Sequence, residues 1–350
     1  MFRYNSSVIQ DDLDNITKNN VALEKFKNAT VLITGINGML ATNLAFLFFY
    51  LNDRFSYNIK IIGLGRNQTE FRERFFDSLN KLDFIEQDIN DKIHIDGDVD
   101  YIFHAATNAS PESMITHPVS IALTNSLGTI NVANLALEKK AHVHFLSTRE
   151  VYGSNKKEAL VESDDSHINS MDIRNVYPIS KLSAESILLA FKNEFNLSIS
   201  ISRIAHAYGP GMKVKNDGRV MADFIGHVLE QKNMILQSDG SAERAFIYVS
   251  DAIAGIINIV LNHSESDFVF NLSNETEPIT VKELAYLIRN IGDEFSLSSE
   301  IIASQHPVIA AGYSKNERVP LNTSNLEKKG WSPVVDLKSG IRKTLKVYLE

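Results

Sequence analysis

The stretch TVLITGINGMLA at residues 30–41 is the most informative part of this sequence. Its first five residues are mostly apolar and β-branched, which is typical of a buried parallel strand, and residues 40–51 form an apolar run of helical length. A strand, a glycine turn and a helix start bring backbone N–H groups and the positive end of the helix dipole to one point. The stretch therefore predicts a pyrophosphate site for a dinucleotide. The alternative is a turn whose glycines serve a steric purpose only.

Five residues of this turn are expected to contact the dinucleotide. Ala41 stands where the usual fingerprint has its third glycine, and the pattern tolerates this because only close packing of the helix on the strand is at stake. The expected contact residues are Gly35, Asn37, Gly38, Met39 and Leu40.

Composition limits the classes of protein to which the chain can belong. Its 350 residues are 44% hydrophobic, enough for a large core in one domain or two interleaved ones. The net charge of −8 argues against nucleic acid or an anionic membrane as partners. The chain has no cysteine, so disulfides, thiolate chemistry and cysteine metal sites are excluded, and we expect no metal. No apolar run reaches membrane length and no signal core is evident, so we expect a cytoplasmic protein.

Strand and helix patterns alternate through the first two thirds of the chain. This alternation predicts an α/β fold, a Rossmann-type doubly wound parallel sheet with helices on both faces. Helices are expected over residues 119–139 and 180–195. Besides the strand at residues 30–34, the expected strands are residues 58–64, 84–88, 101–106, 142–147 and 198–204.

The pattern loosens after residue 205, where a smaller, substrate-binding lobe is expected to begin. A helix over 250–261 and a strand over 268–272 could return to the sheet, so we expect the lobes to be partly interleaved. In such folds ligands bind beyond the carboxyl ends of the strands. The predicted division is an N-terminal extension with a short helix at 1–28, a dinucleotide-binding domain at 29–204 plus about 245–272, and a substrate lobe at 205–244 and 273–350.

The strand at residues 142–147 leads into Thr148-Arg149-Glu150. Side chains alternate along an extended chain, so Thr148 and Glu150 share a face and Arg149 points to the other. A hydroxyl beside a carboxylate suits the binding of a substrate alcohol and a nearby proton transfer. The alternative is an ordinary polar strand end on the surface.

Tyr177 and Lys181 are one helical turn apart, so both can face one site. A nearby ammonium favours the phenolate and lowers the phenol pKa from its reference of about 10, which would make Tyr177 a base. Lys181 could also hold the cofactor ribose. Pro178 suits a first helical turn and places Tyr177 at the helix start. A solvated Tyr–Lys pair is the alternative, and the position one strand–loop–helix unit after Thr148 favours catalysis.

From residue 29 onward the chain resembles the extended short-chain dehydrogenases/reductases that modify nucleotide sugars. Within that family it is most similar to the UDP-glucuronate decarboxylases. The residues that carry the family resemblance are 34–41, 104–106, 125–129, 148–153, 177–181, 208–210 and 244–249, and those that carry the closer one are 109–111, 117–118, 209–212 and 216–220.

The resemblance implies roles for individual residues. Tyr177 would be the base, Lys181 its electrostatic partner, Thr148 the group that binds the sugar 4-OH, and Glu150 a carboxylate near C5 and C6. Two guanidinium groups facing a diphosphate would bind its oxygens bidentately. For one of them, Arg318, a surface ion pair is an equal alternative. The residues implied for substrate are Arg219, Val220, Arg244 and Arg318, and those for the cofactor, besides the glycine turn and the Tyr–Lys pair, are Asp88, Ile89, Ala105 and Ala106, with a buried strand cap as the alternative for Asp88.

Three positions depart from the family pattern. Arg149 replaces the usual Ser or Asp, which counts against ordinary dehydration; it would attract a sugar carboxylate or phosphate, or point into solvent. His206 replaces the usual Asn and would contact the sugar or its phosphate, with a hydrogen-bonded core histidine as the alternative. Gly65-Arg66 ends the second strand without an acidic residue, and such an arginine accommodates a 2′-phosphate. We expect NAD, with Arg66 as a cofactor contact and NADP as the alternative.

These residues predict an enzyme that oxidises the C4 hydroxyl of a nucleotide-diphosphate sugar and then decarboxylates it. The alternatives are a 4-epimerase or 4,6-dehydratase, an NADP-dependent 4-keto-sugar reductase, and a non-catalytic nucleotide sensor. The resemblance also implies a homodimer through the helices at 119–139 and 180–195, although the same apolar faces could simply cover the sheet.

Overall fold

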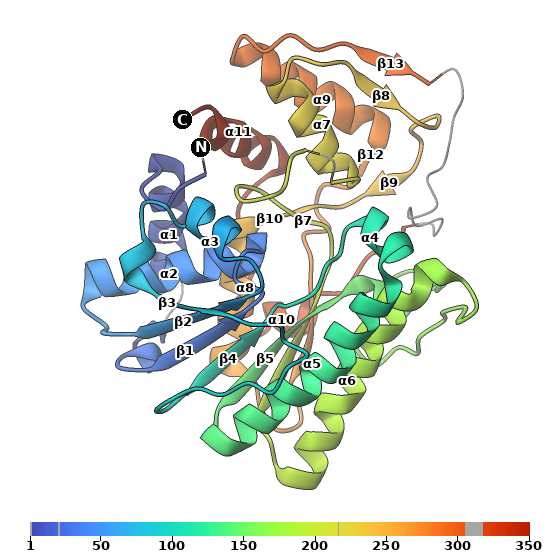
Figure 1. The fold of residues 1–350 in the computed structure, drawn as a ribbon. Helices are drawn as coiled ribbons and strands as arrows, with labels where there is room; N and C mark the ends of the chain where they lie inside the picture. The colour runs from blue at the N-terminus through green and yellow to red at the C-terminus, as the bar shows by residue number, and fades with distance from the viewer. Residues whose placement is uncertain (1, 20–21, 216, 305–317) are drawn as a thin grey trace.

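A computed structural model describes residues 2–19, 22–215, 217–304 and 318–350. Its centre is a seven-stranded sheet in the order β3-β2-β1-β4-β5-β6-β11, with every neighbouring pair parallel (Figure 1). This confirms the predicted Rossmann-type parallel sheet. The strands are β1 Thr30–Thr34, β2 Lys60–Gly65, β3 Asp83–Glu86, β4 Tyr101–His104, β5 His142–Thr148, β6 Ile199–Ile204 and β11 Val269–Leu272.

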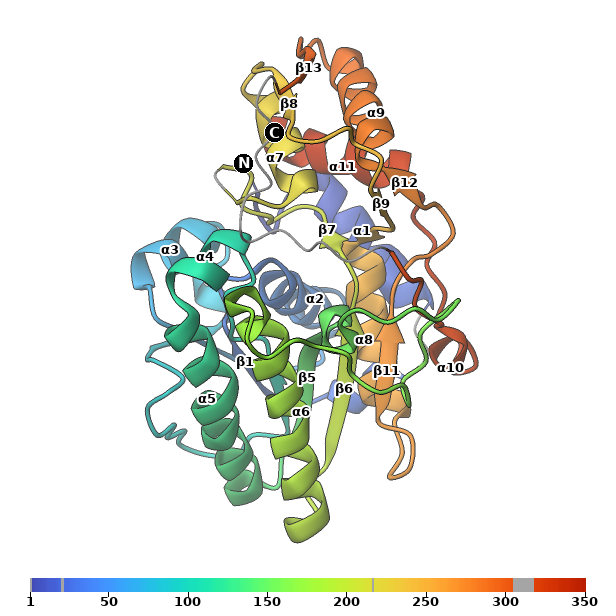
Figure 2. The same cartoon turned by 90° about the vertical axis from the view of Figure 1, so that its right-hand side faces the viewer.

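Helices cover both faces of the sheet. On one face lie α5 (Pro118–Lys139) and α6 (Val176–Phe195), which run side by side in Figures 1 and 2. On the other lie α2 (Met39–Phe55) and α8 (Val249–Asn262). Alternate residues of β1 enter the two cores: Leu32 packs into the α5–α6 side, whereas Val31 and Ile33 pack into the α2–α8 side. Burial on both faces explains why this strand is a continuous apolar run.

The ends of some strands and helices differ from the predicted ones by a few residues. The strand expected at 101–106 ends at His104, because the Ala105 and Ala106 N–H groups donate to the Thr34 hydroxyl instead of extending the ladder. The helix expected from residue 180 begins at Val176, with Pro178 in its first turn, where a missing N–H costs nothing. Tyr177 therefore lies at the helix start, as predicted.

A smaller set of elements lies beyond the carboxyl ends of the strands (Figure 1). The chain leaves the sheet after β6 and returns to it with α8 and β11, the latter pairing with β6. The lobe boundaries assigned from sequence stay a prediction. The elements of this region are α7 Val220–Leu229, α9 Val281–Glu294 and α11 Leu337–Leu349, with the strand pairs β7 Ala207–Tyr208/β10 Ile247–Tyr248, β8 Met234–Leu236/β13 Ile301–Ala303 and β9 Glu243–Arg244/β12 Ile279–Thr280.

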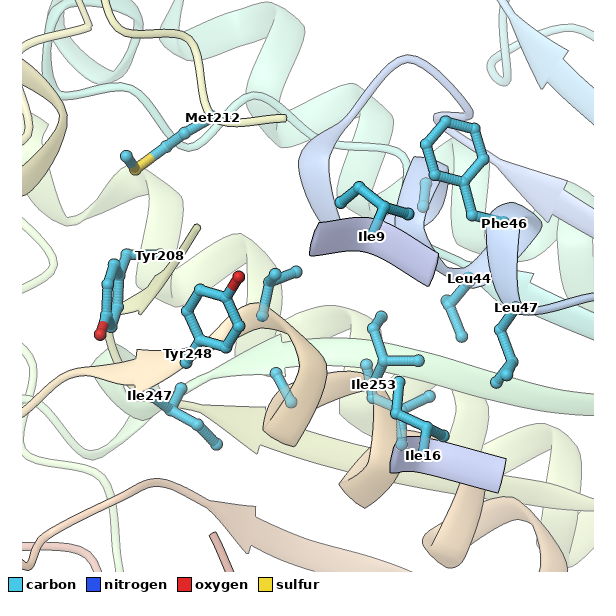
Figure 3. Close-up of a cluster of buried hydrophobic side chains, with 14 of the residues drawn as sticks. Ile9, Ile16, Leu44, Phe46, Leu47, Tyr208, Met212, Ile247, Tyr248 and Ile253 are labelled. Carbon is cyan, nitrogen blue, oxygen red and sulfur yellow. The ribbon is translucent and has the colours of Figure 1, made fainter. Parts of the chain in front are cut away.

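The N-terminal extension contains a helix, α1 (Ser7–Asn19), that packs against α2, α8 and α11. Figure 3 shows Ile9 and Ile16 of α1 in the same apolar cluster as Phe46 of α2 and Ile253 of α8. The Tyr248 hydroxyl donates to Asp12 Oδ2 over 2.8 Å in the same region. The extension is thus part of the main core, as the predicted short helix implied.

Short segments complete the described part of the chain: α3 Gln68–Arg74, α4 Pro111–Thr116, α10 Ser324–Glu327, and the 3-10 turns η1 Leu23–Phe26, η2 Leu79–Lys81, η3 Arg149–Tyr152 and η4 Ile173–Asn175. None of the described helices combines the length and the apolar character needed to cross a bilayer.

Candidate active site

The glycine turn between β1 and α2 is pressed against the end of β4. Gly35 has a φ of +66°, and a Cβ there would lie 2.7 Å from Ala106 Cα and 2.9 Å from the Ala105 carbonyl oxygen. Only glycine fits, because both the backbone conformation and the space exclude a side chain. Gly38 caps the N-terminus of α2, and its N–H donates to the Gly35 oxygen over 2.9 Å. The expected residues Asn37, Met39 and Leu40 are half-buried around this helix start.

A neutral histidine holds the strand ends together beneath the turn. The Thr129 hydroxyl donates to the Asn125 oxygen, so it accepts from His104 Nε2–H at 3.1 Å. His104 Nδ1 then accepts from the Thr34 hydroxyl at 2.9 Å, and that hydroxyl accepts from the Ala105 and Ala106 N–H groups. Complete burial lowers the pKa of His104 to about 3, with Lys181 adding to the effect. The ring therefore stays neutral and serves as a fixed hydrogen-bonding bridge.

Two of the residues expected to contact the cofactor, Arg66 and Asp88, contact each other in the structure. Arg66 Nη1 lies 3.5 Å from Asp88 Oδ2, in a pair exposed on the surface. Ile89 is buried against α5, where a Cβ at Gly128 would approach its Cγ2 to 2.8 Å. Asn37 Nδ2 donates to the Asn67 oxygen at 3.1 Å, while its buried Oδ1 has no partner among the described residues. A glycine cradle, an open helix N-terminus and an unsatisfied amide oxygen fit the pyrophosphate and ribose of a dinucleotide.

Tyr177 is buried at the start of α6, and its phenol hydrogen-bonds Thr148 at the end of β5. The expectation that Lys181 lowers the pKa of this phenol is wrong for this structure. Burial raises the pKa of Tyr177 above its usual value, and the negative charge of Glu150 raises it further. The hydrogen bond from Thr148 and the positive charges of Arg219 and Arg174 oppose this rise without overcoming it.

Lys181 is held by β5. Its Nζ donates to the Leu146 carbonyl over 2.7 Å and lies 4.4 Å from the centre of the Phe145 ring. Burial lowers the pKa of Lys181 to about 7, and the charge of Glu185 partly opposes this shift. The Lys181 side chain is therefore hydrogen-bonded to β5, the strand that ends in Thr148. This contact holds the Tyr–Lys pair next to that strand end.

Glu150 forms an ion pair that sequence reasoning missed. Both of its carboxylate oxygens accept from the guanidinium of Arg174: Nη1 binds Oε2, and Nη2 lies 3.0 Å from Oε1. Arg174 belongs to η4, three residues before Tyr177. The sequence signal for this ion pair was the position of Arg174 close to the Tyr–Lys pair. Arginines are common in polar loops, so this position did not identify Arg174 as a site residue.

Arginines from distant parts of the chain surround His206. Arg149 points inward, since its Nη2 donates to the Val319 oxygen over 3.1 Å, so the solvent-facing alternative is wrong. Arg318 pairs with Glu275, and Arg219 pairs with Asp217 at the start of α7.

His206 itself has a φ of +43°, unusual for a residue with a side chain. Burial lowers the pKa of His206 to about 3, and the charges of Arg149, Arg244, Arg318 and Arg219 lower it further. A neutral imidazole among guanidinium groups creates a region of positive potential that suits an anionic ligand. Val220 is the first residue of α7; Asn216 of the same motif lies outside the described residues. Within the described ranges, no three His, Asp or Glu side chains meet in a way that could hold a metal ion.

Comparison with known proteins identifies the family. Residues 31–273 match the model of the NAD dependent epimerase/dehydratase family, which covers more than half of the chain. The chain therefore belongs to this family, in agreement with the sheet topology and with the glycine turn.

Among curated proteins the chain is similar to UDP-glucuronic acid decarboxylases. It is 31% identical over 266 residues to UDP-glucuronic acid decarboxylase 1 of Xenopus tropicalis, covering 75% of this chain and 59% of that protein. It is 28% identical over 325 residues to UDP-glucuronic acid decarboxylase 6 of Arabidopsis thaliana, covering 90% and 87%. The chain thus spans about 59% of the length of the vertebrate relative that it matches.

Solved structures share the fold. A UDP-glucose 4-epimerase from Thermotoga maritima, solved with UDP-glucose, superposes with a TM-score of 0.76 at 22% identity over 91% of this chain and 98% of that one. A dTDP-glucose 4,6-dehydratase from Bacillus anthracis, solved in complex with NAD, gives 0.71 at 21% identity over 92% and 96%. At these identities the likeness supports the architecture alone.

Proposed function

We propose that this chain is an enzyme that uses bound NAD to oxidise the C4 hydroxyl of a nucleotide-diphosphate sugar and then releases the C6 carboxyl group of a hexuronate as carbon dioxide. The observation that carries the proposal is the meeting of Thr148, Glu150 and Tyr177 at the carboxyl end of β5, two strands away from the Gly35 turn of β1. The similarity to UDP-glucuronic acid decarboxylases supports decarboxylation as the second step.

The residues that would hold the dinucleotide are those of the glycine turn, Asn37, Ala105, Ala106, Ile89 and Lys181. Bound NAD would supply a reversible hydride acceptor for the sugar C4. Arg66 favours NAD over NADP, because its guanidinium is paired with Asp88 and a 2′-phosphate would have to replace that carboxylate.

The chain's own groups would handle the protons. Tyr177 would have to ionise against the burial and the Glu150 charge that raise its pKa, and its phenolate would then take the proton of the 4-OH. The Thr148 hydroxyl would bind the same oxygen. With C4 at the ketone level, the carboxyl group on C5 belongs to a β-keto acid, so the C5–C6 bond can break with its electron pair passing into a C4–C5 enolate as carbon dioxide leaves. A proton would then enter at C5 and the hydride would return to C4, which regenerates the NAD and leaves an alcohol product about 44 mass units lighter than the substrate. Glu150, whose two oxygens accept from Arg174, would face the reacting carbons.

The arginines would hold the substrate's anionic groups. Arg244 and Arg219 would bind the diphosphate, and Arg318 would join them while keeping Glu275 as its counter-ion. Arg149 and His206 would line the sugar end. Arg149 disfavours 4,6-dehydration, because no acid stands at this position to protonate a leaving C6 hydroxyl.

The direct test is to incubate the purified protein with a panel of UDP-, dTDP-, CDP- and GDP-sugars and to weigh the products. A loss of about 44 mass units means decarboxylation, a loss of about 18 means dehydration, and an unchanged mass with a new isomer means epimerisation. Decarboxylation of a nucleotide hexuronate is the expected result. Net consumption of the nicotinamide would instead establish a reductase and refute the proposal.

We also propose a homodimer. Val119, Leu123 and Leu127 are 70%, 45% and 40% exposed, and they recur every four residues along one face of α5. Figure 2 shows α5 and α6 side by side on the outside of the fold. Light scattering during gel filtration should give about twice the chain mass, and Leu123→Glu should give a monomer. A wild-type mass equal to one chain would contradict the proposal.

A further inference from the structure

The Arg174–Glu150 ion pair is a strong polar contact beside the residues of the proposed chemistry. The side chains of Arg174 and Glu150 are only 12% and 25% exposed, so the pair lies largely out of water. A two-pronged Arg–carboxylate contact fixes the plane of the carboxylate as well as its position. Such a contact, largely shielded from solvent, stabilises the fold only when its geometry is precise. Removing one of the two side chains leaves the other charge poorly solvated.

The pair links two segments that are 24 residues apart in the sequence. Glu150 lies in η3 at the end of β5, and Arg174 lies in η4, which leads directly into α6. The Asp172 side chain caps η4 by accepting from the Arg174 N–H at 3.0 Å, and η4 packs against α4 and α6. Arg174 thus joins the two segments that carry Glu150 and Tyr177.

Among the described residues, groups from several elements act on the Tyr177 hydroxyl. Thr148 of β5 hydrogen-bonds it, and Glu150 of η3 presents a negative charge. Arg174 of η4 and Arg219 before α7 present positive charges. Glu150 raises the pKa of Tyr177, whereas Arg174 lowers it, so the two members of the pair act on the phenol in opposite directions.

We propose that Arg174 is a positioning residue, which holds both oxygens of Glu150 in the site and offsets part of the charge of that carboxylate beside the Tyr177 hydroxyl. The role of Glu150 rests on the proposed function; the electrostatic balance on the phenol does not. Without Arg174, the carboxylate that the chemistry needs would suppress the ionisation of the base on which the same chemistry depends.

The first experiment measures the ionisation of the phenol without any turnover. Tyr177 is replaced by 3-fluorotyrosine, which ionises at lower pH than tyrosine, and its midpoint is followed by fluorine NMR. Arg174→Gln should raise the midpoint by about one pH unit, Glu150→Gln should lower it, and the double variant should lie between the two single variants. The matched control is Arg342→Gln, which removes a similar two-pronged pair with Glu294 from the surface and should leave the midpoint unchanged.

The second experiment measures turnover of whichever nucleotide sugar the protein accepts. Arg174→Gln should reduce kcat by about 10- to 100-fold with little change in KM, and should move the acidic limb of the pH profile upward. Arg174→Lys keeps the positive charge but loses the two-pronged contact. The acidic limb of its pH profile should therefore lie at the wild-type pH, whereas only part of kcat should return. It also carries the test if Arg174→Gln does not fold.

The inference is overturned if Arg174→Gln and Glu150→Gln move the midpoint in the same direction, or if Arg174→Lys changes neither kcat nor the pH profile. A wild-type protein that turns over no nucleotide sugar would refute the proposed function, and the NMR midpoints would still decide the role of Arg174.

Discussion

The two halves of the candidate site are built in different ways. The nucleotide half is made of backbone and small neutral groups: the Gly35 turn, the ends of β1 and β4, and His104 between two threonines. The sugar half is made of charged side chains. Its arginines stand at positions 149, 174, 219, 244 and 318, spread over half of the chain. The nucleotide half is therefore shaped by close backbone packing, whereas the sugar half depends on pairs of opposite charges.

The largest effect is expected from Tyr177→Phe in the sugar half. Removing the hydroxyl removes the group that takes the 4-OH proton, so kcat should fall by about 10²- to 10⁴-fold while nucleotide-sugar affinity is kept. Steady-state kinetics and calorimetric binding measure the two quantities. Unchanged turnover would refute the role assigned to Tyr177.

The next largest effect is expected from Gly35→Ala in the nucleotide half. The new Cβ would meet the backbone of Ala106 and Ala105, and the cost of a positive φ adds to the clash. The free energy of unfolding should fall by about 2–5 kcal/mol, with loss of NAD binding.

Gly97→Ala is the matched control, because Gly97 has a φ of +82° and a Cβ added there would meet no described atom within 4 Å. This variant should lose about 1–2 kcal/mol of unfolding free energy and keep NAD binding. Equal losses in the two variants, measured by urea unfolding, would show that the backbone conformation matters and the contact with β4 does not.

Acid should destabilise the protein through its buried neutral histidines. The pKa values of His104 and His144 are lowered to about 3 by burial, well below the unfolded value near 6.5. Between these values the unfolded chain binds more protons, so the free energy of unfolding falls as pH falls from about 6.5 towards 3. The slope should be about 1.4 kcal/mol per pH unit for each histidine.

Urea unfolding at a series of pH values measures this slope. His144→Gln keeps a hydrogen-bonding group between the Ser200 and Ser202 hydroxyls and removes the titrating ring. The slope of its unfolding free energy against pH should therefore be smaller by about 1.4 kcal/mol per pH unit. An unchanged slope would mean that the pKa of His144 does not differ between the folded and the unfolded chain.

The smallest effect is expected from Arg66→Ala at the rim of the nucleotide half. Its pair with Asp88 is exposed and contributes less than about 1 kcal/mol, so stability and NAD affinity should hardly change. Binding of NAD and NADP before and after the change tests the choice of cofactor. A loss confined to NADP would overturn the preference for NAD.

Local sequence determined the fold and the nucleotide half of the site. The β-branched run at β1, the glycines at 35 and 38 and the helical run after them are consecutive, so their geometry follows from short-range sterics. The alternation of strand and helix patterns then predicted the parallel sheet, which the structure confirms, with errors of a few residues at strand ends where side chains such as Thr34 capture backbone N–H groups.

Only the tertiary structure decided the electrostatics of the sugar half. The sequence placed Tyr177 beside Lys181 and so predicted a lowered phenol pKa, but burial and Glu150 raise it, and Arg174 pairs with Glu150 from 24 residues away. The inward turn of Arg149 depends in the same way on the distant carbonyl of Val319. Burial and long-range charge pairing depend on which segments meet in space, and no local pattern encodes that, because desolvation and Coulomb energies are set by distance through the fold rather than along the chain.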